Sequence, residues 1–112
     1  MEKKYRLRDE EQFQQVKNKG RSWSHPLLVL CVLPNGLDYS RFGFSVSKRV
    51  GKAVVRNRVK RLLRESARSR RTVVPPGQDL VFIARNRIRE ATLQEVDSAV
   101  EELLRQASLL SA

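Results

Sequence analysis

Most of the side chains in this sequence that could take part in chemistry are arginines and lysines, and they gather in one segment. Residues 41–71 hold twelve of the 23 Lys and Arg residues but only one acid, Glu65. The rest of the chain carries eleven basic and eleven acidic residues, so the formal net charge of +11 comes from this segment alone. A positive charge confined to one part of a small chain indicates a surface that binds a polyanion.

The centre of the basic segment has the periodicity of an amphipathic helix over about residues 54–70. One side of this helix gathers apolar and small side chains: Val55, Val59, Leu62, Leu63 and Ser66. The other side is cationic, and four of its members recur at every fourth position: Arg56, Lys60, Arg64 and Arg68. Like charges at this spacing repel one another, and an ordinary solvated helix face mixes charges of both signs. A solvated face is the alternative, but the run of one sign favours contact with a nucleic acid.

The same segment resembles a known family signature. The run from Phe42 to Glu65, FGFSVSKRVGKAVVRNRVKRLLRE, is similar to the signature of the bacterial ribonuclease P protein subunit, and its Arg-Asn-Arg motif falls at Arg56–Arg58. The early Arg6-Leu7 pair and the later run Gly77–Arg85 are similar to the family as well. The resemblance therefore covers most of the chain, up to about residue 85.

The resemblance implies the protein subunit of an RNA-based endonuclease. In this family the RNA subunit hydrolyses the phosphodiester bond with bound Mg²⁺ and removes the 5′ leader of precursor tRNA. The protein assists by binding both the catalytic RNA and the leader. We therefore expect two RNA partners, the ribonuclease P RNA and precursor tRNA, and a Mg²⁺ cofactor held mainly by the RNA subunit.

The first expected surface grips the catalytic RNA through the basic segment, where arginine can bridge phosphates with two donors. Its candidates are Lys48, Arg49, Lys52, Arg56, Asn57, Arg58, Lys60, Arg61, Arg64 and Arg68. Asn57 is included because asparagine is a poor choice for the interior of a helix. Arg58 falls near the boundary of the cationic side, so bracing a neighbouring element is the alternative for it.

The second expected surface is a cleft for the extended leader, with the candidates Phe13, Lys17, Cys31, Ser45 and Ser47. Phe13 either packs in the core or presents its ring to an unpaired base at the edge of the cleft. Lys17 and Cys31 stand where the family often carries aromatic residues, which weakens a stacking platform of more than one ring. Ser45 and Ser47 alternate with apolar residues along a predicted strand and leave that face small and polar.

The sequence predicts no catalytic centre within the protein. The acids cluster at residues 9–11 and 95–102, away from the basic segment, and none is paired with a base, a nucleophile or a set of metal ligands. The lone Cys31 fits a buried strand position, and the lone His25 fits a loop. We therefore expect no metal site in the protein.

Neither a membrane segment nor an export signal is expected. No apolar run approaches the roughly 18 residues of a membrane span, and no apolar stretch follows the first residues. These features predict a cytoplasmic protein with no membrane partner. A DNA-binding helix-turn-helix would need a helix just before the basic one, where a strand is predicted, so no DNA is expected. The remaining alternative is a ribosomal or general structured-RNA-binding protein with no role in cleavage.

The length of 112 residues predicts one RNA-binding domain with flexible ends at residues 1–8 and 109–112. The expected class is α+β, a small sandwich of about four strands and about three helices in the order α-β-β-β-α-β-α. The basic helix lies between two strands and forms a crossover. Such crossovers are nearly always right-handed, but the resemblance implies a left-handed one.

Local signals place most of these elements. One helix is expected between an N-cap at Asp9 and Gly20, and the final helix starts at a Thr92–Glu95 capping box and continues to about residue 108. The Asn35-Gly36 pair is typical of a hairpin turn. Strands are expected at Leu27–Leu33, Arg41–Ser47 and Leu80–Ala84.

Overall fold

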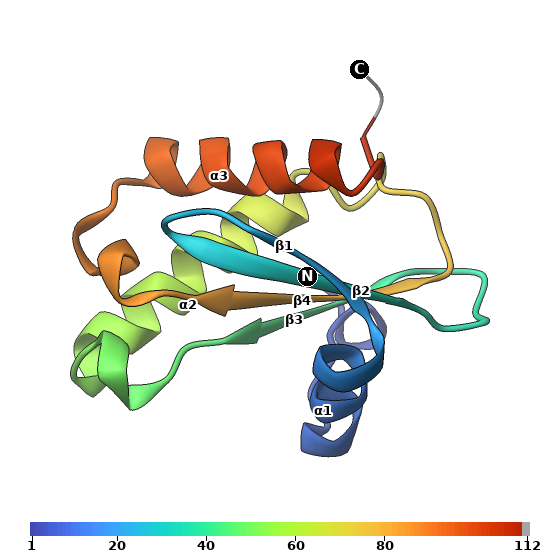
Figure 1. The fold of residues 1–112 in the computed structure, drawn as a ribbon, viewed down its shortest axis with the longest axis horizontal. Helices are drawn as coiled ribbons and strands as arrows, with labels where there is room; N and C mark the ends of the chain where they lie inside the picture. The colour runs from blue at the N-terminus through green and yellow to red at the C-terminus, as the bar shows by residue number, and fades with distance from the viewer. Residues whose placement is uncertain (111–112) are drawn as a thin grey trace.

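Four strands form one mixed sheet, with two helices on one face and one helix on the other (Figure 1). The computed structural model describes residues 1–110. The strands are β1 (Arg21–Ser24), β2 (Leu28–Pro34), β3 (Arg41–Ser45) and β4 (Gln78–Ala84). The helices are α1 (Glu10–Lys19), α2 (Ala53–Arg68) and α3 (Leu93–Gln106), and short 3-10 turns are η1 (Lys3–Tyr5), η2 (Lys48–Val50) and η3 (Asn86–Glu90). The predicted α+β class and the predicted order of helices and strands are confirmed.

The strands lie in the order β1-β2-β4-β3, so β4, the last strand in the sequence, is central. It pairs antiparallel with β2 and parallel with β3, and α2 carries the chain from β3 across to β4. Local signals in the sequence did not place β1, because three of its four residues, Arg21, Ser22 and Ser24, are polar and only Trp23 is partly buried.

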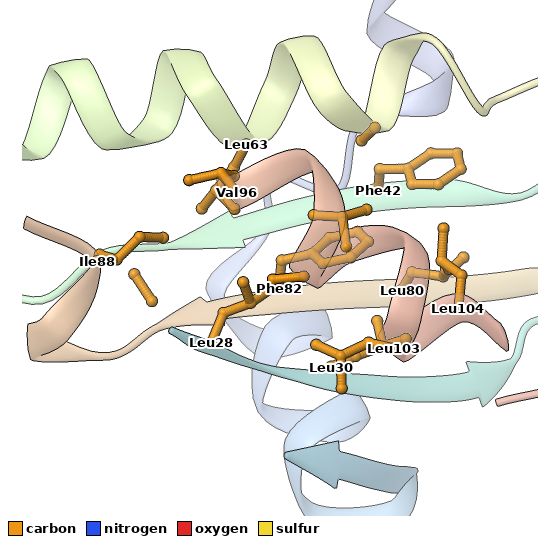
Figure 2. Close-up of a cluster of buried hydrophobic side chains, with 14 of the residues drawn as sticks. Leu28, Leu30, Phe42, Leu63, Leu80, Phe82, Ile88, Val96, Leu103 and Leu104 are labelled. Carbon is orange, nitrogen blue, oxygen red and sulfur yellow. The ribbon is translucent and has the colours of Figure 1, made fainter. Parts of the chain in front are cut away.

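Alternation along the strands sends side chains to both faces of the sheet. On the face covered by α2 and α3, Phe42 and Phe82 pack with Leu63 of α2 and Leu103 of α3 (Figure 2). These side chains are at most 1% exposed and form the centre of the main core. A smaller cluster lies under α1 on the other face and consists of Leu7, Val16, Cys31 and Val81.

Both predicted helix starts are capped as expected. The Asp9 carboxylate accepts a hydrogen bond from the Glu11 amide at 2.9 Å. At the start of α3, the Thr92 hydroxyl accepts from the Glu95 amide and the Glu95 carboxylate accepts from the Thr92 amide. These bonds satisfy amides that have no partner within the helix.

The expected hairpin at Asn35-Gly36 is wrong, although the turn itself forms. Gly36 has a φ of 72°, and the Asn35 side-chain oxygen accepts from the Leu37 amide at 2.8 Å. The strands on either side of this turn do not pair, because β4 inserts between β2 and β3. The Asn35 amide group instead donates to the buried Asp79 of β4 at 2.9 Å, which ties the turn to the central strand.

The segment before α1 lies along the free edge of β3. The buried Leu7 donates its amide hydrogen to the Phe42 carbonyl at 2.8 Å. Tyr5 packs edge-on against Tyr39, and the Arg71 guanidinium lies 4.2 Å from the centre of the Tyr5 ring. The flexibility of residues 1–8 stays a prediction.

At the other end, Leu109 is buried against the main core, and Leu110 is partly buried beside it. Residues 111–112 of the predicted flexible end 109–112 lie outside the described residues.

A partly buried arginine, Arg70, joins the end of α2 to α3. Arg70 donates to both carboxylate oxygens of Asp97, at 2.6 and 3.0 Å, and the Ser66 hydroxyl adds a bond to Asp97 at 2.8 Å. The hydrogen bonds from Arg70 are the main cause of a lowered pKa at Asp97, and they outweigh the opposing effect of burial. The charged form of Asp97 therefore stabilises the contact between the two helices.

Replacing Asp97 with Asn should lower the free energy of unfolding at neutral pH by about 1 kcal/mol, a modest value because much of the carboxylate is exposed to water. The stabilisation is present above the unfolded-state pKa, near 3.8, and disappears as the pH falls through the lower folded-state pKa. Urea unfolding of both proteins as a function of pH measures this difference. The matched control is Glu90→Gln, since Glu90 is exposed and has no side-chain partner in residues 1–110. A difference between Asp97→Asn and the native chain that does not vary with pH would contradict the assignment.

Candidate nucleic-acid interface

α2 has the two sides that its sequence predicted. Val59 and Leu63 are fully buried against the sheet, and Ser66 and Ala67 are buried beside them. Asn57 and Arg61 are exposed on the opposite side, where Lys60 and Arg64 are half-buried. Arg68 is exposed and pairs with Glu65 at 2.8 Å. Among residues 1–110, Arg68 is the only cation on this side of α2 that forms an ion pair with an acidic side chain.

Two arginines of the Arg-Asn-Arg motif are used inside the protein. Arg56 donates from Nε to the Gly51 carbonyl at 3.1 Å. Arg58 reaches away from the row of cations and donates to the carbonyls of Arg89 and Ala91, at 3.2 and 2.7 Å. The structure therefore supports the bracing alternative for Arg58, since its donors are directed at the protein backbone.

A cationic hollow of about 200 Å³ lies between α2 and the N-terminal segment. Its charged lining consists of Arg6, Arg8, Lys60 and Arg64, with no acid among the lining residues. Burial lowers the pKa of Arg6, and the charges of Arg64 and Arg8 lower it further. The Nε atom of Arg64 is buried without a hydrogen-bond partner in the protein. An anion in this hollow would satisfy that donor and reduce the repulsion between the cations.

A second group of cations lies where the parallel strands β3 and β4 end. The turns that follow these strands, η2 and η3, are in contact with each other. η2 supplies the exposed Lys48 and Arg49, and the chain after β4 supplies the exposed Arg85 and Arg87. Lys52 is exposed at the start of α2 and makes no side-chain capping bond.

Sequence reasoning missed Arg6, Arg8, Arg85 and Arg87, which the fold places beside the predicted cations. The first two are distant in sequence from α2, and only folding brings them to Lys60 and Arg64. A signal for the other two exists in the basic run Arg85-Asn-Arg-Ile-Arg, which directly follows a predicted strand. The carboxyl ends of parallel strands meet at one edge of a sheet and commonly form ligand sites.

The face of the sheet under α1 has a covered row and an open row. The strand registers align Cys31, Val81 and Gly43, with Cys31 and Val81 both buried in the cluster under α1. The neighbouring row has partly exposed apolar residues at its centre and serines at its ends: Ser24, Val29, Ile83 and Ser45. This open row leaves apolar side chains accessible between hydroxyl groups at its two ends.

Phe13 stands at the boundary between the covered and open parts of this face. It packs against the cluster under α1, is partly buried, and also lines the cationic hollow. Gly43 permits this position, because a Cβ at Gly43 would lie 2.7 Å from the Cζ atom of Phe13. Both alternatives for Phe13 are therefore compatible with its place in the structure.

The remaining candidates for the leader cleft are more scattered. Lys17 lies on α1 close to Cys31. Burial raises the pKa of the Cys31 thiol, and the positive charge of Lys17 partly opposes this shift. Cys31 is 5% exposed and is covered by α1, so its side chain lies beside the open row and does not contribute to it. Ser45 is partly exposed at the end of β3, and Ser47 is exposed two residues further on.

The acids are concentrated on α3, which carries Glu95, Asp97, Glu101 and Glu102. Within residues 1–110, no three His, Cys, Asp or Glu side chains are grouped so that they could hold a metal ion. The described residues therefore do not fit a magnesium site of the protein's own. A search of the same residues finds no helix with the length and apolar character needed to cross a membrane.

Known proteins resemble this chain in both sequence and fold. The family described as Ribonuclease P matches residues 1–108. The ribonuclease P protein component of Alkaliphilus oremlandii is 44% identical over 107 residues, covering 96% of this chain and 94% of that protein. The corresponding protein of Clostridium novyi is 45% identical over 111 residues, covering 97% of this chain and 98% of the relative.

Solved structures of ribonuclease P proteins superimpose along nearly the whole chain. The protein from Staphylococcus aureus has a TM-score of 0.88 at 30% identity and covers 96% of this chain and 98% of its own. The protein from Thermotoga maritima has a TM-score of 0.82 at 33% identity, with 90% and 96% covered. The agreement in sequence, in fold and in the basic signature shows that this chain belongs to the ribonuclease P protein family, the protein component of an RNA-based endonuclease that matures the 5′ ends of tRNA.

Proposed function

We propose that the cationic side of α2, the hollow beside it and the basic turns η2 and η3 bind the catalytic RNA of ribonuclease P. The observation that carries this proposal is the hollow lined by Arg6, Arg8, Lys60 and Arg64, where a buried arginine donor lacks a partner and no acid is present. Phosphate oxygens match these donors and neutralise their charge, as the general chemistry of RNA binding requires. Along α2, Asn57, Arg61 and Arg68 extend the same surface.

The open row of the sheet under α1 holds the single-stranded 5′ leader of precursor tRNA in this proposal. The serines at the ends of the row are small enough for a backbone or a base to approach the sheet there, and their hydroxyls can bind ribose or phosphate groups. The row is the floor of the proposed leader site, with the apolar side chains of Val29 and Ile83 at its centre. Phe13 contributes the exposed part of its ring as a stacking surface at the edge of the floor. Lys17, Ser45 and Ser47 line the path in this proposal, whereas Cys31 is covered by α1 and takes part only in packing beside it.

The protein takes no chemical step in this proposal. The RNA subunit holds the Mg²⁺ and cleaves the phosphodiester bond, while the protein neutralises phosphates where the catalytic RNA and precursor tRNA approach each other. Fewer diffuse cations are then needed to offset repulsion between the two RNAs. The proposal places this work in the cytoplasm, where bacterial precursor tRNA is made.

The direct test is cleavage of precursor tRNA by a bacterial ribonuclease P RNA at low Mg²⁺ concentration, with and without this protein. We expect the protein to lower the Mg²⁺ concentration at half-maximal cleavage. We also expect it to favour precursor over mature tRNA in binding. A general RNA-binding protein would give neither effect, and that outcome would reject the proposed function.

Replacing Arg61 and Arg64 with Ala should weaken binding to the catalytic RNA. It should also reduce the slope of log affinity against log salt by about one unit for each lost phosphate contact. Filter binding over a range of salt concentrations measures the slope. The matched control is the double variant Lys19→Ala and Arg105→Ala, which removes two charges from α1 and α3, outside the proposed surface. An equal change of slope in the control would show that net charge, and not this surface, determines binding.

Replacing Phe13 with Ala should reduce the preference for leader-bearing over mature tRNA severalfold, because stacking on one aromatic ring contributes about 1–3 kcal/mol. Gly43→Ala should have the same effect, since its added Cβ displaces the ring while Phe13 itself remains. Competition binding with the two tRNA forms, in the presence of the catalytic RNA, measures the preference. If both variants weaken binding of the two forms equally, Phe13 acts only in packing.

A further inference from the structure

Two arginine side chains, those of Arg58 and Arg89, link α2, η3 and η2 through hydrogen bonds to backbone carbonyls. Arg89, in η3, donates from Nε to the Val50 carbonyl at 2.6 Å and from Nη2 to the Arg49 carbonyl at 3.4 Å. Arg58, in α2, donates to the carbonyls of Arg89 and Ala91, at 3.2 and 2.7 Å. Arg58 therefore holds the backbone that carries Arg89, and Arg89 in turn holds η2. We call these four bonds the arginine clasp.

The segment held by the clasp is short, and only Val50 anchors it in the core. η2 is a three-residue turn in which Val50 donates its amide hydrogen to the Ser47 carbonyl at 3.1 Å. Gly51 follows in an extended conformation with a φ of 158°, and its carbonyl accepts from Arg56. The Val50 side chain is fully buried, whereas Lys48 and Arg49 are exposed. The clasp thus fixes the backbone from which two exposed cations, Lys48 and Arg49, project.

We propose that Arg89 is a positioning residue for RNA binding, which holds η2 so that Lys48 and Arg49 present their charges in one arrangement. This inference rests on the proposed function, because those two cations belong to the surface that binds the catalytic RNA. A preformed turn avoids the entropy of ordering flexible cations when the RNA arrives. Arg58 supports the same turn indirectly, because its bonds fix the end of η3, which carries Arg89.

The geometry separates this role from a direct contact with phosphate. Two donor atoms of Arg89 are directed at carbonyl oxygens, which a phosphate cannot replace without releasing η2. Lysine carries the same charge, but its single ammonium group lacks the planar fork of donors. A charge-preserving change to Lys therefore removes the clasp, whereas it would largely preserve a simple electrostatic contact.

The first experiment measures amide hydrogen exchange of Val50 in the free protein, for the native chain and for Arg89→Lys and Arg89→Gln. We expect exchange at Val50 to accelerate by about tenfold or more in both variants, since charged hydrogen bonds to the turn are lost. The amide of Phe82, in the centre of β4, should exchange as in the native chain and so report that the fold is intact. Arg87→Gln, which removes a charge from the same turn, is the matched control and should leave Val50 unchanged. Native exchange at Val50 in both Arg89 variants would overturn the proposal.

The second experiment measures affinity for the catalytic RNA over a range of salt concentrations. We expect Arg89→Lys and Arg89→Gln to lose affinity to a similar degree. Arg58→Lys should resemble them, and the Arg58→Lys/Arg89→Lys double variant should be little worse than either single variant, because both residues act on one turn. Native affinity in Arg89→Lys, with a reduced salt slope in Arg89→Gln, would identify a phosphate contact and overturn the positioning role. If the native protein does not bind the RNA, the proposed function fails, and the exchange experiment still decides whether the clasp orders η2.

Discussion

The structure depends on apolar burial that offsets the repulsion between many like charges on a small surface. α2 can carry its cations because Val59 and Leu63 are fully buried on its other side, against a sheet whose core is apolar. Burial of these side chains stabilises the helix in place of the pairs of opposite charge that support an ordinary surface helix. The repulsion is therefore retained in the folded protein, most clearly at Arg6 and Arg64 in the hollow beside α2. A polyanion can relieve that repulsion, which connects the stability of this surface to its function.

Arginine serves three purposes in this fold, and geometry separates them. Arg70 is partly buried and binds Asp97, and Arg41 binds both oxygens of the buried Asp79, so these two arginines join elements that pack around the core. Arg58 and Arg89 bind backbone carbonyls and hold the turns beside the proposed RNA surface. Others, such as Arg61 and Arg87, are exposed on that proposed surface. The planar guanidinium with its several donors suits all three environments, which a lysine could not serve equally well.

The two proposed surfaces are neighbours because of the way α1 and the N-terminal segment pack. α1 covers one row of the sheet and leaves the next row open, and Phe13 lies at the boundary between them. The same Phe13 lines the hollow that Lys60 and Arg64 border from α2. An RNA bound along α2 and a leader bound on the sheet would thus meet near this ring, where both would be close to the same cations.

The sequence by itself determined the helices, the amphipathic character of α2 and the basic segment, because capping residues and the spacing of apolar positions act over a few neighbouring residues. It also placed three of the four strands to within two residues at each end. Tertiary structure decided what depends on contacts between distant segments. It placed β4 between β2 and β3, so that Asn35-Gly36 joins no hairpin, and it brought Arg6 and Arg8 to α2. It also turned Arg58 toward the backbone of η3 and buried Cys31 beneath α1. No local pattern encodes these outcomes, since each is set by which elements share the core.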